Sequence, residues 1–372
     1  MTALAERLQR PEARTVAVAL AAAVFLVSWG LIHRGFYAGH EIVDTPTYES
    51  YGERLLDGHV PYRDFRVEYP PGALPVFVLP ALGGDYASVF AWLMAACGLV
   101  TLLAVARVRL AAAFFVAVSP LLVGSLVLSR FDLWPAALTA IALAALLEDR
   151  HRLGWGFLGA AVAAKLYPFV LVPLALAWTW RRARLRDALA GVVVFAAIVL
   201  PFFVLSPGGV WDSLYGQASR PLQIESLGAA AVTTLAHPDV VTSHGSQNVV
   251  GFGWLALLTV CVQIGVVVAL WIDFARRPDD LPRSAAAAVT AFVAFGKVLS
   301  PQFLVWLVPL VPLVRGRRAL AAIGLLVTAL VLTQVWFPAR YWDYVYHFDL
   351  AGVVLARDLA LAALVAVLAL HR

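Results

Sequence analysis

The chain has 372 residues, of which 62% are hydrophobic and 14% are charged, and its formal net charge is +5. A soluble globular domain carries about 25% charged side chains, so this composition excludes one and predicts an integral membrane protein. The positive charges sit in short loops between apolar runs, where they set orientation in a membrane, and no nucleic-acid partner is expected.

Apolar runs near or above about 18 residues recur along the chain, and each is long enough to cross the hydrocarbon core as a helix. They predict an all-α polytopic membrane protein, a single domain over residues 1–372 with about 9–12 transmembrane or half-spanning helices. Full spans are predicted near residues 16–33, 86–106, 110–128, 133–147, 188–205, 249–272, 319–337 and 351–370.

Two further apolar stretches, 153–180 and 284–314, have basic loops at both ends. Both ends should therefore lie on the cytoplasmic side. Since each stretch is short for two full crossings, it is predicted to be a hairpin of short or half-spanning helices hinged at a proline. The hinges read "KLYP" (165–168) and "KVLSP" (297–301).

The distribution of charge predicts which loops face outward. Cytoplasmic segments hold 18 Arg against 8 acidic residues, and external segments hold 7 Arg against 14 acidic residues. This asymmetry follows the positive-inside rule and predicts a multi-pass membrane protein whose charged first loop faces outward. The external segments are 34–85, 129–132, 206–248 and 338–350.

The first external segment is rich in charge, with ten charged side chains between residues 41 and 68. Within it, "TPTYESYGERLLDG" predicts a short helix with Thr45 as N-cap and Gly58 past its end. One face carries Tyr48, Tyr51 and Leu55, so this helix is expected to lie in the membrane interface. The following "EYPPG" predicts a stiff extended turn into an apolar segment that is too short to span.

A charged loop held against the membrane suits a site where an acidic base, basic phosphate ligands and aromatic rings meet one substrate. The alternative is that the loop is solvated surface and that Asp44 only supports the start of the short helix.

Four stretches of the sequence resemble actinobacterial members of glycosyltransferase family 87, a group of the GT-C superfamily, and they occur in the expected order. They are "DTPTYESYGERLLDGHVPYRDFRVEYPPGALPVF" (44–77), "SRFDLWPAAL" (129–138), "AAKLYPFVLVPLAL" (163–176) and "GKVLSPQFLVWLVPL" (296–310).

The resemblance implies an inverting hexosyltransferase that takes a sugar from a polyprenyl-phosphate donor lipid. The sugar passes to a glycolipid or envelope glycan acceptor at the external face. Mannose is the expected sugar, and arabinofuranose donors occur in the same family. No cofactor and no nucleotide sugar are expected.

The resemblance also implies that an acidic residue of the first external loop is the catalytic base, and Asp44 stands at that position. Many GT-C enzymes carry paired acidic residues there, whereas two apolar residues separate Glu41 from Asp44 in this chain. Glu41 is therefore the alternative base. A carboxylate within reach of an acceptor hydroxyl can take its proton in the transition state.

Lys165 and Lys297 are the only two lysines in the sequence, and both lie at the proline hinges. A charge inside apolar sequence is a functional candidate by default. We expect one or both of these lysines to bind the donor phosphate, helped by Arg63 or Arg66. The alternative is that they reach the membrane interface or pair with a loop acid such as Asp64.

Further candidates surround these positions. Arg130 and Asp132 share a tight external turn and are expected to pair with each other, and Gln302 could bond a sugar hydroxyl. The 206–248 loop, with "SRPLQIES" and "SHGSQN", is expected to help select the acceptor. Histidines near the first loop lack metal-binding spacing, so no obligatory metal is expected. The remaining supporting candidates are Tyr62, Glu68, Tyr69 and Tyr167.

A transporter or lipid flippase is the main alternative, because intramembrane lysines and broken helices also mark transporter paths. Against it, ionisable residues cluster in the external loops, and only Arg357 and Asp358 lie inside a predicted full span. A noncatalytic scaffold is the third possibility.

Overall fold

The computed structural model describes residues 11–35 and 42–370. Within that part of the chain, six segments are long and apolar enough to cross a membrane, which confirms the all-α polytopic prediction. They are α2 (Pro11–His33), α5 (Tyr86–Val108), the Leu185–Leu205 segment with η3 (Leu185–Ala188) and α11 (Leu189–Leu205), α14 (Gly253–Arg276), α16 (Ala319–Trp336) and α18 (Ala351–Ala369).

Shorter helices complete the bundle: α6 (Leu110–Val123), α7 (Leu126–Ser129), α8 (Leu133–Leu147), α9 (His151–Ala164), α10 (Val172–Arg181) and α15 (Leu281–Ala294). The single span predicted over 110–128 is wrong, because it consists of α6 and α7. Gly124 adopts φ 74, a conformation that ends α6 after Val123 and that a residue without a side chain adopts readily.

Both predicted hinges are confirmed. Helix α9 ends at Ala164, Lys165 is extended, and the chain resumes as η2 (Tyr167–Leu171) before α10. In the second hairpin, α15 ends at Ala294 and the chain resumes as η4 (Pro301–Leu307) and η5 (Val311–Leu313). A proline lacks the N–H that an α-helix interior requires, so each helix stops before it.

The first external loop contains α3 (Thr45–Leu56), η1 (Pro71–Ala73) and α4 (Leu74–Ala81). The N-cap of α3 is Asp44 rather than the predicted Thr45. The expected membrane-interface face is also wrong, since Tyr48 and Tyr51 are buried and their rings lie 4.5 and 5.9 Å from Phe77 of α4. The aromatic face therefore packs inside the protein, where stacked rings stabilise the loop.

The 206–248 segment contains α12 (Pro207–Ala218), α13 (Leu227–Leu235) and a hairpin of β1 (Val240–Ser243) and β2 (Ser246–Val249). The sequence predicted helices alone, so these strands are a correction. His244 and Gly245 both have positive φ, as a two-residue hairpin turn requires. The last external segment holds α17 (Tyr341–His347).

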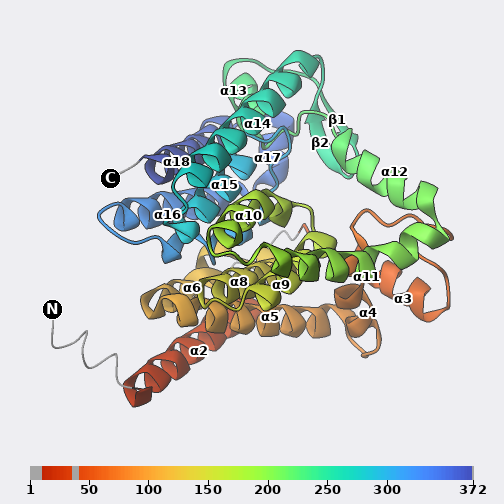
Figure 1. Cartoon of the computed structure of the whole chain (residues 1–372). Helices are drawn as coiled ribbons and strands as arrows, with labels where there is room; N and C mark the ends of the chain where they lie inside the picture. The colour runs from red at the N-terminus through yellow and green to blue at the C-terminus, as the bar shows by residue number, and fades with distance from the viewer. Residues whose placement is uncertain (1–10, 36–41, 371–372) are drawn as a thin grey trace.

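The helices pack closely where glycines face each other. A Cβ on Gly159 of α9 would lie 2.2 Å from the Gly191 carbonyl oxygen of α11, so these helices touch through their backbones. Figure 1 shows α3, α4 and α12 together at the right of the molecule. External segments from different parts of the sequence therefore meet at one end of the bundle.

Candidate active site

A cavity of about 670 Å³ lies where the first external loop, the two hinges and the 213–247 segment meet. Loop residues and half-spanning helices that are far apart in the sequence thus enclose one continuous cavity. Eight of the residues predicted from the sequence line it: Asp44, Glu68, Tyr69, Arg130, Lys165, Tyr167, Lys297 and Gln302.

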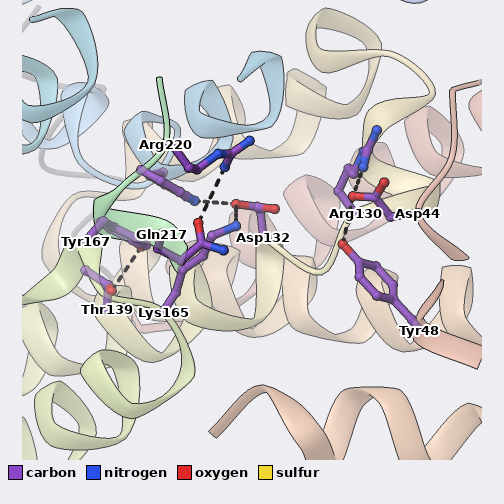
Figure 2. A network of polar contacts seen from close by, with 10 residues as sticks. Asp44, Tyr48, Arg130, Asp132, Thr139, Lys165, Tyr167, Gln217 and Arg220 are labelled. Atoms are coloured by element: carbon purple, nitrogen blue, oxygen red, sulfur yellow. Dashed lines mark hydrogen bonds and ion pairs between the residues drawn. The ribbon is translucent and has the colours of Figure 1, made fainter. Parts of the chain in front are cut away.

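Lys165 is fixed at the cavity wall by a buried carboxylate. Its Nζ lies 2.6 Å from Oδ1 of Asp132, whose side chain is 1% exposed, and Trp306 Nε1 donates to the same oxygen at 2.6 Å. Figure 2 shows Lys165 directed at Asp132. The predicted pairing of Asp132 with Arg130 is therefore wrong, because each finds a partner on a different element.

Aromatic rings surround the Lys165 ammonium. Its Nζ lies 4.5 Å from the ring centre of Phe131 and 5.2 Å from that of Trp306, and the rings of Tyr69 and Phe303 follow at 5.9 and 5.7 Å. Ring faces attract cations, so these contacts add to the attraction of the Asp132 carboxylate. The positive charge that Lys165 presents to the cavity is therefore already partly neutralised by Asp132 and the surrounding rings.

Tyr167 supports this wall rather than presenting a free hydroxyl. Its ring stacks on Trp306 with centres 4.1 Å apart, and its hydroxyl shares a 3.1 Å hydrogen bond with Thr139. The buried stack fixes the position of the indole that bonds Asp132.

Asp44 lies on the opposite side of the site and pairs with Arg130 (Figure 2). Tyr48 donates a 3.2 Å hydrogen bond to Asp44, and Arg130 also donates to the Ile42 carbonyl at 3.0 Å. Burial lowers the pKa of Arg130 to about 10, which leaves the guanidinium charged at neutral pH. The Asp44 side chain remains 29% exposed, so a substrate hydroxyl can reach it.

Arg220 was not predicted individually, although it belongs to the "SRPLQIES" stretch. It lines the cavity, lies close enough to Lys165 and Lys297 for their charges to repel, and its buried Nε lacks a hydrogen-bond partner in the described structure. Lys297 donates only to the Ala218 carbonyl, at 2.8 Å. Across residues 11–35 and 42–370, neither Arg220 nor Lys297 has an acidic ion-pair partner. Their positive charges therefore favour binding of an anion in the cavity.

Residues 62–66 of the first external loop do not line the cavity. Arg63 is exposed and pairs with Asp64 at 2.9 Å, which lowers the pKa of Asp64 to about 2. Tyr62 donates to the Tyr69 carbonyl at 2.6 Å and is buried in the loop. Arg66 is exposed beside Gly216 of α12. None of these four predicted candidates lines the cavity, and Glu41 lies outside the described residues.

Glu225 and Tyr341 also line the cavity, and the sequence did not point to Glu225 individually. The Tyr341 hydroxyl lies near the Glu225 carboxyl, and burial raises the pKa of that carboxyl to about 7. The only signal for Glu225 was its place in the loop assigned to acceptor selection. In the described part of the chain no three His, Cys, Asp or Glu side chains gather to hold a metal, and metal independence stays a prediction.

Comparisons with known proteins identify the family. The model of glycosyltransferase family 87 matches residues 68–301, and the model named mannosyltransferase (PIG-M) matches residues 242–369. The search of curated proteins gives no match.

A solved structure, ArnT from Cupriavidus metallidurans bound to undecaprenyl phosphate, is 16% identical to this chain. The match covers 95% of this chain and 76% of that chain with a TM-score of 0.50, and it confirms the predicted GT-C fold. Because the family model spans more than half of the sequence, the chain belongs to glycosyltransferase family 87.

Proposed function

We propose that this glycosyltransferase moves mannose, with inversion, from a polyprenyl-phosphate donor to a hydroxyl of a glycolipid or glycan acceptor at the external face of the membrane. The observation that carries the proposal is the shared cavity, which is lined by the Asp44 carboxylate and by Lys165, Arg220 and Lys297, and Figure 2 shows Asp44 apart from Lys165 and Arg220. Family membership favours an enzyme over the transporter and scaffold alternatives.

Asp44 is the base in this proposal. The acceptor oxygen forms a bond to the anomeric carbon while the bond from that carbon to the phosphate oxygen breaks. The hydroxyl proton passes to Asp44, and the electron pair of the broken bond leaves with the polyprenyl phosphate. Tyr48 and Arg130 hold the carboxylate in place for this transfer.

Arg220 and Lys297 are the main ligands of the departing phosphate. Neither forms an ion pair with an acid in the described structure, whereas the charge of Lys165 is shared with Asp132. Cations fixed in a partly desolvated cavity stabilise the negative charge that develops on the leaving group. The undecaprenyl phosphate bound to ArnT, a protein of the same fold, supports a lipid phosphate as the donor here.

Two further observations support the sugar and the side of the membrane. The match to a mannosyltransferase model over residues 242–369 favours mannose. The cavity is lined by segments that the charge asymmetry assigns to the outside, such as 34–85 and 206–248.

Sealed right-side-out vesicles from cells that produce the chain test the donor and the side together. Radiolabelled polyprenyl-phosphate-mannose and an extracted glycolipid fraction are added outside, with vesicles lacking the chain as control. We expect label to enter the glycolipid with this donor and not with GDP-mannose. Transfer from the nucleotide sugar, from polyprenyl-phosphate-arabinofuranose alone, or only in inverted vesicles would contradict the proposal.

A further inference from the structure

The segment between α12 and α13 ends in a hydrogen-bonded turn, in which Ser226 N donates to Gln223 O at 3.0 Å, and contacts from several elements hold it rigidly. Ser226 caps α13 through its side chain, and residues 222–225 are bonded through their backbone. The bonds run from Gln223 N to Lys297 O (2.9 Å), Ile224 N to Gln247 O (3.0 Å), Val249 N to Leu222 O (2.9 Å), Tyr344 Oη to Ile224 O (2.7 Å) and Arg357 Nη2 to Glu225 O (2.8 Å).

This rigid segment presents two buried polar side chains to the cavity. Gln223 is 2% exposed, Glu225 is 3% exposed, and both line the cavity. Both residues belong to the turn that Ser226 N closes onto Gln223 O, and this turn lies at the cavity wall.

In each of these side chains an acceptor oxygen is free. Gln223 Nε2 donates to Ser300 Oγ at 3.1 Å, and the Tyr341 hydroxyl lies near the Glu225 carboxyl. In the described structure, Gln223 Oε1 and Glu225 Oε2 have no hydrogen-bond partner. Buried polar atoms are normally paired, so two unpaired acceptors facing a cavity call for a ligand with hydroxyl donors.

The position of Glu225 indicates which part of the substrate these acceptors meet. Glu225 lies within electrostatic reach of Arg220, one of the phosphate-binding cations, and of Arg130, which holds Asp44. In an inverting transfer, the sugar ring lies between the leaving phosphate and the base. Glu225 therefore stands beside the space that the transferred sugar would occupy.

We propose that Gln223 and Glu225 form a subsite that binds hydroxyl groups of the transferred sugar. The proposal rests on the proposed function for the identity of that sugar. Both free atoms accept hydrogen bonds, as sugar hydroxyls require, and the rigid backbone keeps them at fixed positions. A site built to pair hydroxyls discriminates strongly against a ligand that lacks them.

Binding measurements on the purified full-length chain in lipid nanodiscs test this subsite without depending on transfer. The probes are polyprenyl-phosphate-mannose and sugar-free polyprenyl phosphate. Fluorescence of Trp306 and Trp342, which line the cavity, reports binding. Glu225→Gln and Gln223→Leu are compared with Glu148→Gln, which removes a carboxylate that pairs with Arg107 outside the cavity.

We expect Glu225→Gln and Gln223→Leu each to lower affinity for the sugar-bearing lipid about tenfold, the effect of one strong hydrogen bond. Affinity for the sugar-free lipid should stay unchanged, and Glu148→Gln should bind both lipids like the wild type. If Glu225→Gln does not fold, Gln223→Leu alone decides the test.

Two results would overturn the subsite: unchanged affinity of both variants for the sugar-bearing lipid, or an equal loss of affinity for both lipids. If the wild type binds the sugar-bearing lipid more tightly than the sugar-free lipid but transfers no mannose, the proposed function fails and the subsite stands.

Discussion

Lys165 and Lys297 have similar sequence contexts, but the structure gives them different surroundings. Lys165 is bonded to the buried Asp132 and enclosed by aromatic rings, whereas Lys297 is half-buried and donates only to a carbonyl. Removing one partner of a buried ion pair leaves the other charge without compensation, and that is strongly destabilising. The two lysines should therefore respond differently to the same substitution.

Lys165→Met should lower the free energy of unfolding by about 3–5 kcal/mol, because Asp132 stays buried without its cation. Lys297→Met should leave stability near the wild-type value and weaken binding of polyprenyl phosphate about tenfold or more. Thermal unfolding in detergent and lipid-binding titrations measure both effects.

The double variant Lys165→Met/Asp132→Asn is the control, since it removes both charges and should recover most of the lost stability. The structural role of Lys165 is contradicted if Lys165→Met unfolds like the wild type. The phosphate-binding role of Lys297 is contradicted if Lys297→Met binds polyprenyl phosphate with wild-type affinity.

Sequence alone could identify these residues but not their partners. A lysine beside a proline in apolar sequence is visible in one dimension, and both hinge lysines indeed line the cavity. Pairing depends on how elements meet in space. Asp132 was expected to pair with Arg130 two positions away, yet its partner comes from the hinge after α9.

At the scale of elements, breaks caused by proline were predictable and breaks caused by packing were not. Both hairpins open at their lysine and proline motifs because proline cannot continue a helix. The break between α6 and α7 depends on a positive φ at Gly124, which sits against the Gln334 side chain of α16. Such a contact between distant elements leaves no local pattern in the sequence.

The turn at η1 docks onto the end of α9 through Gly72. A Cβ at this position would lie 2.6 Å from the backbone of Ala163, and the Gly72 carbonyl accepts a 2.9 Å bond from Trp134. Because Lys165 begins just after this helix end, the same contact sets the first external loop against the cavity wall.

Gly72→Ala should therefore lower stability by about 1–3 kcal/mol, as overpacking does, and reduce transfer. Gly84→Ala is the matched control in the same external loop, since nothing lies within 4 Å of a Cβ there. Unfolding temperature and transfer rate measure the difference. Equal unfolding temperatures and transfer rates for the two variants would show that η1 does not pack tightly against the end of α9.

At the scale of the whole molecule, hydropathy and charge predicted the spans and the loops that form the cavity. Hydropathy and charge could not show which charged residues of a loop face the cavity. Arg63 and Arg66 are as prominent in sequence as Arg130, but the first two are exposed away from the cavity and only Arg130 lines it. Arg220 and Glu225 escaped notice because their loop has no motif whose chemistry identifies it.

The central claim is that one outward-facing carboxylate, Asp44, takes the acceptor proton in a cavity whose opposite side binds a lipid phosphate. Asp44→Asn keeps the shape of the side chain and removes the base. Asp57→Asn is the matched control, because Asp57 is exposed in the same loop and does not line the cavity. Polyprenyl-phosphate binding and thermal unfolding check that the Asn variant is folded despite the loss of the partner of Arg130.

The most direct measurement is the single-turnover rate of mannose transfer by the purified chain at saturating donor and acceptor. The account predicts that Asp44→Asn lowers this rate about 10²- to 10⁴-fold while lipid-phosphate binding stays intact, and that Asp57→Asn transfers at the wild-type rate. Transfer at the wild-type rate by folded Asp44→Asn protein would contradict the role of Asp44 as the base.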